Sequence, residues 1–573
     1  MPCIMMQFGR LALLTLFTGA VRASETTSLP QLQSPLGPVV NLGYAAYAGN
    51  STSPTGELNG PVTFFGGIPF AQPPLGDLRF RAPQQLDETI KNGGDVPVFD
   101  ARNFGPACIQ QPAVVGVGSE DCLQLNVWKP SNATEGDNLP VVIYVYGGGF
   151  YYGTTQGFPM YDWVNQHPGG VIAVSMSYRL NVLGFLSGSA VRENGDENAG
   201  LLDQRAAFEW VQRHISKFGG DPNEVTIDGE SAGGASIVMQ VVAYGGTQGA
   251  PFKRAIAQSI GFGPTANSSQ METYFANVTE AAGCPNTGEA AMSCLRSASL
   301  GAIVSAVNHV PTGMVSPVID GNFLPDFPSR LIASGNFSTV DFIGGHCTND
   351  GRTFVGGSPS QFTSDEDVAT IPFKRWPGVT NNTIQQALKL YPSPDTPGSP
   401  FTSQYDRAAT MAGDIIFTCM DYFLAEQMSA VKGVKNVFAF RWNAPDPVLL
   451  AAAPYEGTMH TSDLYFLFDG TNSAGNAGFT FTPFNTTEES LSAAAIAYWT
   501  SFVTAGDPSS EKLASSPSWS PFAPAGQSSR MRIVLTEGTS PGTTASVMEA
   551  LTPEHIERCQ FWMQANVTAE TTI

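Results

Sequence analysis

The sequence predicts an α/β protein with a large, mostly parallel central sheet covered by helices on both faces. Two observations lead to this class. Short runs of β-branched and apolar residues recur along the chain, as in strands that are buried on both faces. Helical patterns separate several of these runs, the clearest at 201–218, where Trp210 and Ile215 share one apolar face. The expected strands are 141–146, 171–177, 225–228, 255–258, 340–344, 437–442 and 531–535.

The length of 573 residues and the hydrophobic content of 42% allow a large core. No Pro/Gly/Ser-rich linker, charge block or repeat marks a boundary, so we expect residues 24–573 to form a single domain with long loop insertions. The net charge of −21 argues against nucleic acid and against anionic membranes as partners.

Residues 1–23 have the pattern of a secretory signal peptide. A short n-region ends at Arg10, an apolar core spans 11–20, and Val21-Arg22-Ala23 places small residues before the expected cleavage site. Later segments are shorter than a membrane span, and the C-terminus has no hydrophobic tail. We therefore expect a secreted protein without a membrane anchor. Eight sequons are compatible with glycosylation: Asn50, Asn132, Asn267, Asn277, Asn336, Asn381, Asn485 and Asn566.

The cysteines fit an oxidising compartment. Removal of Cys3 with the leader leaves seven, so one stays unpaired. Close spacing suggests two pairs, Cys108 with Cys122 and Cys284 with Cys294, each closing a short loop that is worth roughly 3 kcal/mol. No Cys/His spacing resembles a metal site, and we expect neither a metal nor a cofactor.

The most informative motif is Gly229-Glu230-Ser231-Ala232-Gly233. It follows the apolar run 225–228 and leads into 235–242, an apolar segment without Pro that predicts a buried helix. In this strand, turn and helix context the serine of Gly-x-Ser-x-Gly becomes an exposed nucleophile. The glycines are expected because a Cβ beside the strained turn would crowd the serine or the helix.

A glycine triplet follows the expected strand 141–146, in Gly147-Gly148-Gly149-Phe150. An isolated triplet is also compatible with a flexible turn. Upstream of a nucleophile elbow, however, its open backbone N–H groups suit an oxyanion, and Ala232, which follows the serine, would supply another N–H.

A serine nucleophile of this kind needs an acid and then a base further along the chain. Of the six histidines, His460 lies in a loop after the strand 437–442 and is the preferred base. His555 follows the helix-start signal Thr552-Pro553-Glu554 and is expected on a helix surface.

The acid should follow a strand between the nucleophile and the base. Strand 340–344 leads to Asp350, and Gly351 would permit a tight turn there. Asp341, Glu456 and Asp463 are alternatives with ordinary surface roles.

With these residues in place, the chain resembles the type-B carboxylesterase/lipase family, which includes cholinesterases and fungal lipases and has the α/β-hydrolase fold. The resemblance runs in order over most of the mature chain. The matching stretches are Gly67-Ile68-Pro69-Phe70-Ala71-Gln72-Pro73-Pro74, Arg79-Phe80, Ser119-Glu120-Asp121-Cys122-Leu123-Gln124-Leu125-Asn126-Val127, Asn198-Ala199-Gly200-Leu201-Leu202-Asp203-Gln204 and Phe218-Gly219-Gly220-Asp221-Pro222.

The resemblance implies a catalytic triad of Ser231, Asp350 and His460. The family usually has glutamate where Asp350 stands, and the shorter side chain requires its loop to approach His460 more closely; other members also use aspartate. The resemblance further implies an oxyanion hole, three disulfides with Cys347 left free, and a structural ion pair. The residues concerned are Gly148, Gly149 and Ala232; Cys108–Cys122, Cys284–Cys294 and Cys419–Cys559; and Arg79–Glu120.

The expected activity is hydrolysis of carboxylic esters through an acyl-enzyme. In lipases of this family the loop of the first disulfide is a lid, but here 109–121 has thirteen residues and no aromatic. This favours a lidless esterase for soluble short- to medium-chain or aryl esters. The alternatives are a lipase or sterol esterase whose lid comes from 358–400, and a non-catalytic adhesion protein, which the intact triad argues against.

Overall fold

The structure, a computed structural model, describes residues 32–573 apart from a few short segments. The segments left out are 53–60, 91–95, 262, 433, 435, 473–479 and 524–528. The expected signal peptide, residues 1–23, lies outside the described residues.

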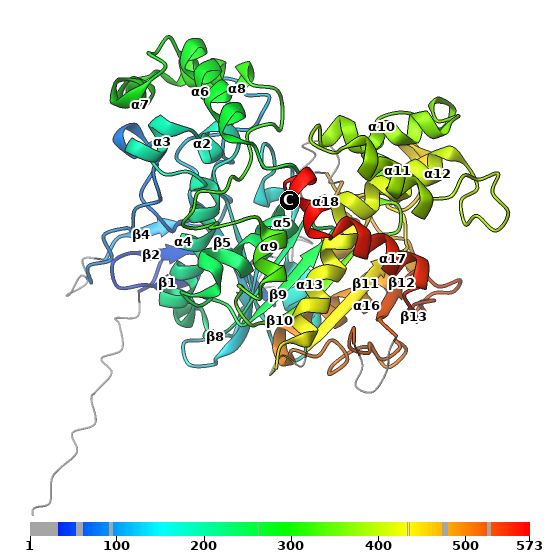
Figure 1. The fold of residues 1–573 in the computed structure, drawn as a ribbon. Coiled ribbons are helices and arrows are strands. Elements are labelled where there is room, and N and C mark those ends of the chain that lie inside the picture. The colour runs from blue at the N-terminus through cyan, green and yellow to red at the C-terminus, as the bar shows by residue number, and fades with distance from the viewer. Residues whose placement is uncertain are drawn as a thin grey trace, which may run out of the picture.

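A ten-stranded sheet forms the centre of the molecule (Figure 1), in the order β13-β12-β11-β10-β9-β8-β6-β7-β5-β3. The strands from β12 to β7 pair in parallel, while β13, β5 and β3 add antiparallel pairs at the two edges. The strands are β3 (Val62–Pro69), β5 (Gln124–Pro130), β6 (Leu139–Val145), β7 (Ile172–Met176), β8 (Gly220–Glu230), β9 (Arg254–Gln258), β10 (Asp341–Cys347), β11 (Val437–Trp442), β12 (Met531–Leu535) and β13 (Val547–Ala550). A small separate sheet contains β1 (Val39–Asn41), β2 (Ala46–Ala48) and β4 (Val98–Asp100).

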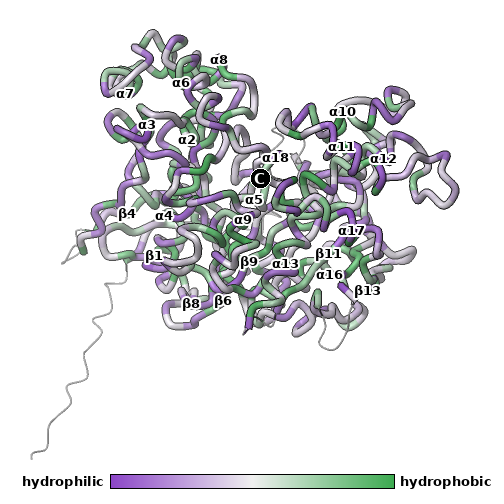
Figure 2. Tube along the Cα trace, viewed as in Figure 1, coloured by the Kyte–Doolittle hydropathy of each residue, from purple (hydrophilic) through white to green (hydrophobic). Residues whose placement is uncertain are grey.

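The prediction of a mostly parallel α/β sheet is confirmed, and the seven expected strands correspond to β6 to β12. These strands are almost wholly apolar because helices cover both of their faces. In β6, every side chain from Val141 to Val145 is buried. Figure 2 shows apolar segments gathered around the central strands.

One set of helices packs together on one face of the sheet: α4 (Ala199–His214), α5 (Ala232–Val242), α9 (Pro328–Ala333) and α13 (Cys419–Ala430). A second set packs together on the other face: α16 (Thr486–Ala505) contacts β6 and β8, α1 (Tyr161–Gln166) contacts β3, β5 and β7, and α15 (Ser462–Leu467) packs against α16.

Two further groups stand apart at the top of Figure 1. The first contains α2 (Asn181–Phe185), α3 (Ser189–Asn194), α6 (Ser268–Ala282), α7 (Gly288–Ser297) and α8 (Leu300–His309), and the second α10 (Asp365–Arg375), α11 (Asn381–Leu390) and α12 (Gln404–Gly413). The remaining helices are α14 (Pro447–Ala452), α17 (Pro553–Trp562) and α18 (Ala565–Thr571).

The expectation that every segment after the leader is shorter than a membrane span was wrong. Helices α12 and α13 are continuous through a π-helical turn at 414–418, so Gln404–Ala430 forms a 27-residue helix that is long and apolar enough to cross a membrane. Within the protein, however, 89% of its apolar window is buried. Helices α7 and α8 would pass the same test only if joined across their bend of 119°. The long helix is therefore packed as part of the core.

Three disulfides join the cysteine pairs expected from spacing and resemblance, Cys108–Cys122, Cys284–Cys294 and Cys419–Cys559. Cys347 is buried and free. The expected ion pair is also present: Arg79 donates from Nε and Nη2 to both carboxylate oxygens of Glu120, at 2.6 and 2.8 Å.

Candidate active site

Ser231 lies at the junction between β8 and α5 and has the strained backbone angles φ 59° and ψ −121°. The flanking glycines are sterically required. A Cβ on Gly233 would lie 2.1 Å from the carbonyl oxygen of Val145, and a Cβ on Gly229 would lie 2.7 Å from the backbone of Gly233. The tight turn keeps Ser231 partly exposed although strand and helix are buried around it.

The side chains of Ser231, His460 and Asp350 form a hydrogen-bonded chain. The Nε2 atom of His460 lies 2.9 Å from Ser231 Oγ, and its Nδ1 atom lies 2.7 Å from Asp350 Oδ1. The serine follows β8, the aspartate follows β10, and the histidine comes from the loop after β11. Carboxyl ends of parallel strands meet at one edge of a sheet, which explains how residues so distant in sequence come together.

The second oxygen of Asp350 is also fixed. Oδ2 accepts hydrogen bonds from Ser259 Oγ at 2.9 Å and from the backbone N–H of Cys347 at 2.8 Å. Ser259 was missed in the sequence, where its signal is a polar residue directly after the buried strand β9. Gly351 has no positive φ; it is required because a Cβ there would lie 2.0 Å from the carbonyl oxygen of Ala409 in α12.

None of the three alternative acids is hydrogen-bonded to His460 in the described structure. Glu456 accepts a hydrogen bond from Thr353 Oγ1 at 3.0 Å, and Asp341 lies 3.9 Å from Arg254. Asp463 is fully buried, so the expectation of a surface role was wrong for it.

His555, the alternative base, lies in α17 as expected, but it is only partly exposed. Its ring packs against Tyr422 at 5.3 Å, and Nε2 lies 3.6 Å from Asp414. Burial, with some opposition from Asp414, lowers its pKa to about 4. The expectation of an open surface position was therefore wrong, and the residue belongs to a separate polar group.

Glu230, which precedes the nucleophile, is a further acidic group at the site. Its Oε1 atom is buried, lies 3.3 Å from His460 Nε2 and has no hydrogen-bond donor among the described residues. Burial, then Asp463 and Asp350, raise the pKa of Glu230 well above its ordinary value, which favours the protonated form. The sequence analysis did not place Glu230 beside His460, although Glu230 is the variable residue of the Gly-x-Ser motif.

Asp463 makes the folding stability of the protein depend on pH. Burial, and then the charge of Asp350, raise its pKa from 3.8 to about 7, so between these values the folded state holds a proton that the unfolded state has lost. Its contribution to stability is complete below pH 3.8 and disappears as the pH rises through 7. Asp463→Asn should therefore flatten the fall in unfolding free energy over this range, measured by urea denaturation. An unchanged slope would contradict the assignment.

Three backbone N–H groups are candidates for an oxyanion hole from the sequence pattern, two in the glycine triplet and one directly after Ser231. Gly148 and Gly149 have φ values of +106° and +60°, and among the described residues no acceptor takes their N–H groups. A Cβ on Gly148 would lie 2.2 Å from the carbonyl oxygen of Tyr152. The N–H of Ala232 belongs to the first residue of α5 and has no acceptor within the helix. These groups are free to donate to a developing oxyanion.

Two aromatic rings hold the imidazole. The centroid of Phe417 lies 4.7 Å from that of His460, and Phe354 meets His460 edge-on at 5.1 Å. A Cβ on Gly261 would lie 3.3 Å from Ser231 Oγ and 3.4 Å from Phe417, so a larger residue would crowd this flank of the serine. The rings fix the imidazole in line with the serine and make the surroundings apolar.

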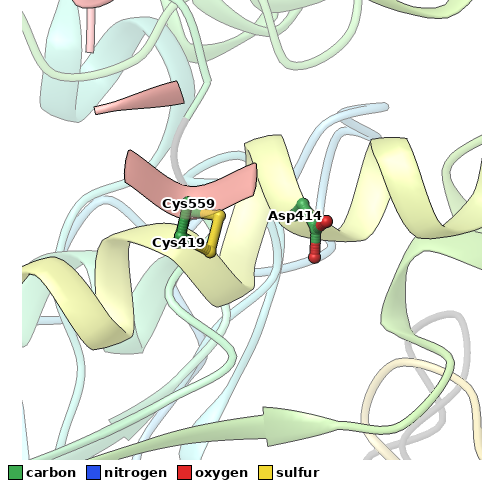
Figure 3. A group of neighbouring side chains, drawn as sticks. All are labelled: Asp414, Cys419 and Cys559. Carbon is green, nitrogen blue, oxygen red and sulfur yellow. A yellow bond between two sulfur atoms is a disulfide. The ribbon is translucent and has the colours of Figure 1, made fainter. Parts of the chain in front are cut away.

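One group among the described residues has metal-ligand spacing, namely Asp414, Cys419 and Cys559 (Figure 3). The two sulfur atoms are bonded to each other, and a metal requires thiolates. Asp414 instead accepts hydrogen bonds from Arg558 Nε at 2.6 Å and Tyr391 at 2.7 Å. The group is structural.

The chain matches known proteins over most of its length. The model of the carboxylesterase family matches residues 37–562. Secreted lipase ARB07186/07185 of Arthroderma benhamiae is 33% identical, with 80% of this chain and 83% of that protein covered. Lipase 2 of Geotrichum candidum is 32% identical, with coverage of 72% and 82%. The crystal structure of Aspergillus niger EstA superposes with a TM-score of 0.79 at 30% identity, covering 94% of this chain and 99% of that one. The chain belongs to the carboxylesterase family and is a carboxylic ester hydrolase.

Proposed function

We propose that Ser231, His460 and Asp350 carry out this hydrolysis through an acyl-enzyme. His460 Nε2 accepts the proton of Ser231 Oγ as that oxygen attacks the ester carbonyl, and the imidazolium then protonates the departing alcohol. Water attacks the acyl-enzyme with His460 again as base, which releases the acid and restores the serine. The observation that carries this proposal is the pair of contacts at 2.9 and 2.7 Å that places the imidazole between hydroxyl and carboxylate.

The charges that develop during the reaction have partners. Asp350 stabilises the imidazolium, and the N–H groups of Gly148, Gly149 and Ala232 would hold the tetrahedral oxyanion. Removing one donor of this kind costs roughly 10²–10³ in rate. The buried surroundings of His460 strengthen each of these interactions, because they are poorly screened by water.

We further propose that the substrates are soluble short- to medium-chain or aryl esters. The loop closed by Cys108 and Cys122 forms no helix, and hydrogen bonds anchor Gln111 and Ala113 in its first half. Asn308 exchanges two hydrogen bonds with the backbone of Ala113, at 2.7 and 2.8 Å, and the side chain of Gln111 donates to two carbonyl oxygens at the end of α8. A loop with these anchors is poorly suited to swing as a lid.

The alternative lid segment, 358–400, is also fastened. The buried Arg407 bonds with Asp365 at the start of α10 and donates from Nε to the carbonyl oxygen of Tyr391 at 2.5 Å. Opening the segment would leave the guanidinium without these partners, which is costly for a buried charge.

A lipase is the second candidate, and one feature favours it. Val114, Val115 and Val117 at the tip of the disulfide loop are 57%, 62% and 58% exposed. Three exposed valines on one loop could contact a lipid surface. Several relatives are also named lipases.

A tributyrin titration separates the two candidates. For a lidless esterase we expect the rate to follow a hyperbolic curve that continues smoothly through the solubility limit of tributyrin. Replacing the three exposed valines together by serine should leave this curve unchanged. A rate that rises abruptly only above the solubility limit, and that the serine variant loses, would favour the lipase.

We also propose that residues 24–573 form one secreted domain. Support comes from the leader pattern of residues 1–23 and from relatives named as secreted. Expression with the native leader in a eukaryotic host should release a protein into the medium whose N-terminus is Ser24.

A further inference from the structure

Arg375, the last residue of α10, has a guanidinium without an acidic partner. In the described part of the chain it makes no hydrogen bond or ion pair, and its Nε atom is buried without an acceptor. Its Cζ atom lies 5.4 Å from the ring centroid of Phe354 and 5.7 Å from that of Trp376. Two rings therefore position the charge and leave its N–H donors unused.

Two routes connect this guanidinium with the proposed catalytic groups. Phe354, which lies beneath Arg375, is also the ring that meets His460 at 5.1 Å. Gly261 lies against Ser231 Oγ, and two residues later a Cβ on Gly263 would lie 3.9 Å from Arg375 Nη2. Arg375 is thus separated from the base by the ring of Phe354, and from the nucleophile by the backbone segment 261–263.

Tyr151 completes the surroundings. It follows the glycine triplet closely, and its ring lies 2.6 Å from the place of a Cβ on Gly149. Burial raises the pKa of Tyr151, and the charge of Arg375 opposes that rise, so the two side chains are electrostatic neighbours. The charge of Arg375 therefore acts on the residue that packs against Gly149 of the proposed oxyanion hole.

A structural role explains only part of this arrangement. The charge at the end of α10 is stabilised by the helix dipole and by the two rings. Burial lowers its pKa to about 10, so the guanidinium remains charged at neutral pH. The chain has 49 acidic and 28 basic residues, which makes an arginine without an acidic partner unusual. The neighbouring Arg352 and Arg407, by contrast, pair with Asp406 and Asp365.

We propose that Arg375 binds a carboxylate of the substrate, so that the preferred esters carry a negatively charged carboxylate in addition to the scissile ester. Suitable substrates are half-esters of dicarboxylic acids and esters of carboxylated phenols or alcohols. The planar guanidinium can donate two parallel hydrogen bonds to such a group. This inference rests on the proposed function, because the carboxylate is recognised only in an ester held at Ser231.

The test compares matched charged and neutral esters. On the acyl side, mono-4-nitrophenyl glutarate and azelate are compared with 4-nitrophenyl butyrate and octanoate. On the alcohol side, 4-acetoxybenzoate is compared with its methyl ester. Arg375→Met should lower kcat/KM for at least one charged ester by roughly 10–100-fold, chiefly through KM, and leave its neutral counterpart within about twofold. Arg375→Lys keeps the charge but cannot donate two parallel hydrogen bonds, so its kcat/KM for the charged ester should lie between those of the wild type and Arg375→Met.

Arg330→Met provides the control, because Arg330 also stacks on a ring, that of Phe327, but has an acidic partner in Asp326. It should leave the ratio of charged to neutral rates unchanged. With the wild-type enzyme, glutarate should competitively inhibit hydrolysis of the neutral ester, and added salt should weaken this inhibition. This measurement does not depend on the folding of a variant.

Equal losses on charged and neutral esters in Arg375→Met, or an unchanged ratio for every pair, would overturn the inference and leave the proposed function intact. Absence of inhibition by glutarate and by longer dicarboxylates would also overturn it. If the wild-type protein hydrolysed none of the neutral esters, the proposed function itself would fail.

Discussion

Ser231→Ala is expected to lower the rate of ester hydrolysis by roughly a millionfold while the fold remains unchanged. The hydroxyl supplies the attacking oxygen and lies 2.9 Å from the base, and nothing else in the described site offers an alcohol or thiol at that distance from His460 Nε2. The substitution removes one partly exposed atom and introduces no new contact in the strained turn. The measurement is 4-nitrophenol release from the butyrate ester, together with circular dichroism and the thermal midpoint.

A fluorophosphonate probe gives an independent control for this prediction. It should add its mass to the wild-type peptide that contains Ser231 and leave Ser231→Ala unlabelled. The exposed Ser268 in α6 offers a matched variant, Ser268→Ala, which should keep full activity and labelling. Substantial hydrolysis by Ser231→Ala would show that another residue is the nucleophile.

The sequence could predict what depends on local pattern. Strands β6 to β12 carry continuous apolar runs, and the elbow around Ser231 is encoded within five residues. The antiparallel strands β3, β5 and β13 were missed. Two glycines interrupt the apolar run of β3, polar residues alternate with apolar ones in β5, and β13 is largely exposed. Cys419 and Cys559, 140 residues apart, could be paired only through the family resemblance.

The surroundings of the site could not be predicted because they depend on contacts between distant segments. Ser259 reaches Asp350 across 91 residues, and Phe417 reaches His460 from the π-helical turn of the long core helix. Neither residue type signals such a contact in its own neighbourhood. The burial of Asp463 and the isolation of Arg375 likewise follow from the packing of helices that no periodicity relates to the site.

Asp350→Asn should lower kcat by about 10⁴-fold, because the surrounding hydrogen-bond donors fix the orientation of the side-chain amide. The place of Oδ2 receives the hydroxyl of Ser259 and the backbone N–H of Cys347, so the amide oxygen should take that place and the NH₂ group should face His460 Nδ1. That donor would hold the proton of the imidazole on Nε2, where it can no longer accept one from the serine.

The matched variants make this last prediction specific to the acid. Asp350→Glu introduces the family's more common residue and should retain part of the rate, limited by a loop packed for the shorter carboxylate, with the Asp350 contact to His460 at 2.7 Å. Glu456→Gln alters a carboxylate bonded to Thr353 rather than to the imidazole and should keep a near-normal rate. Pre-steady-state kinetics should place the loss in Asp350→Asn in acylation. A near-normal rate in this variant, with a large loss in Asp463→Asn, would make Asp463 the acid, since it is fully buried and interacts electrostatically with both Asp350 and His460.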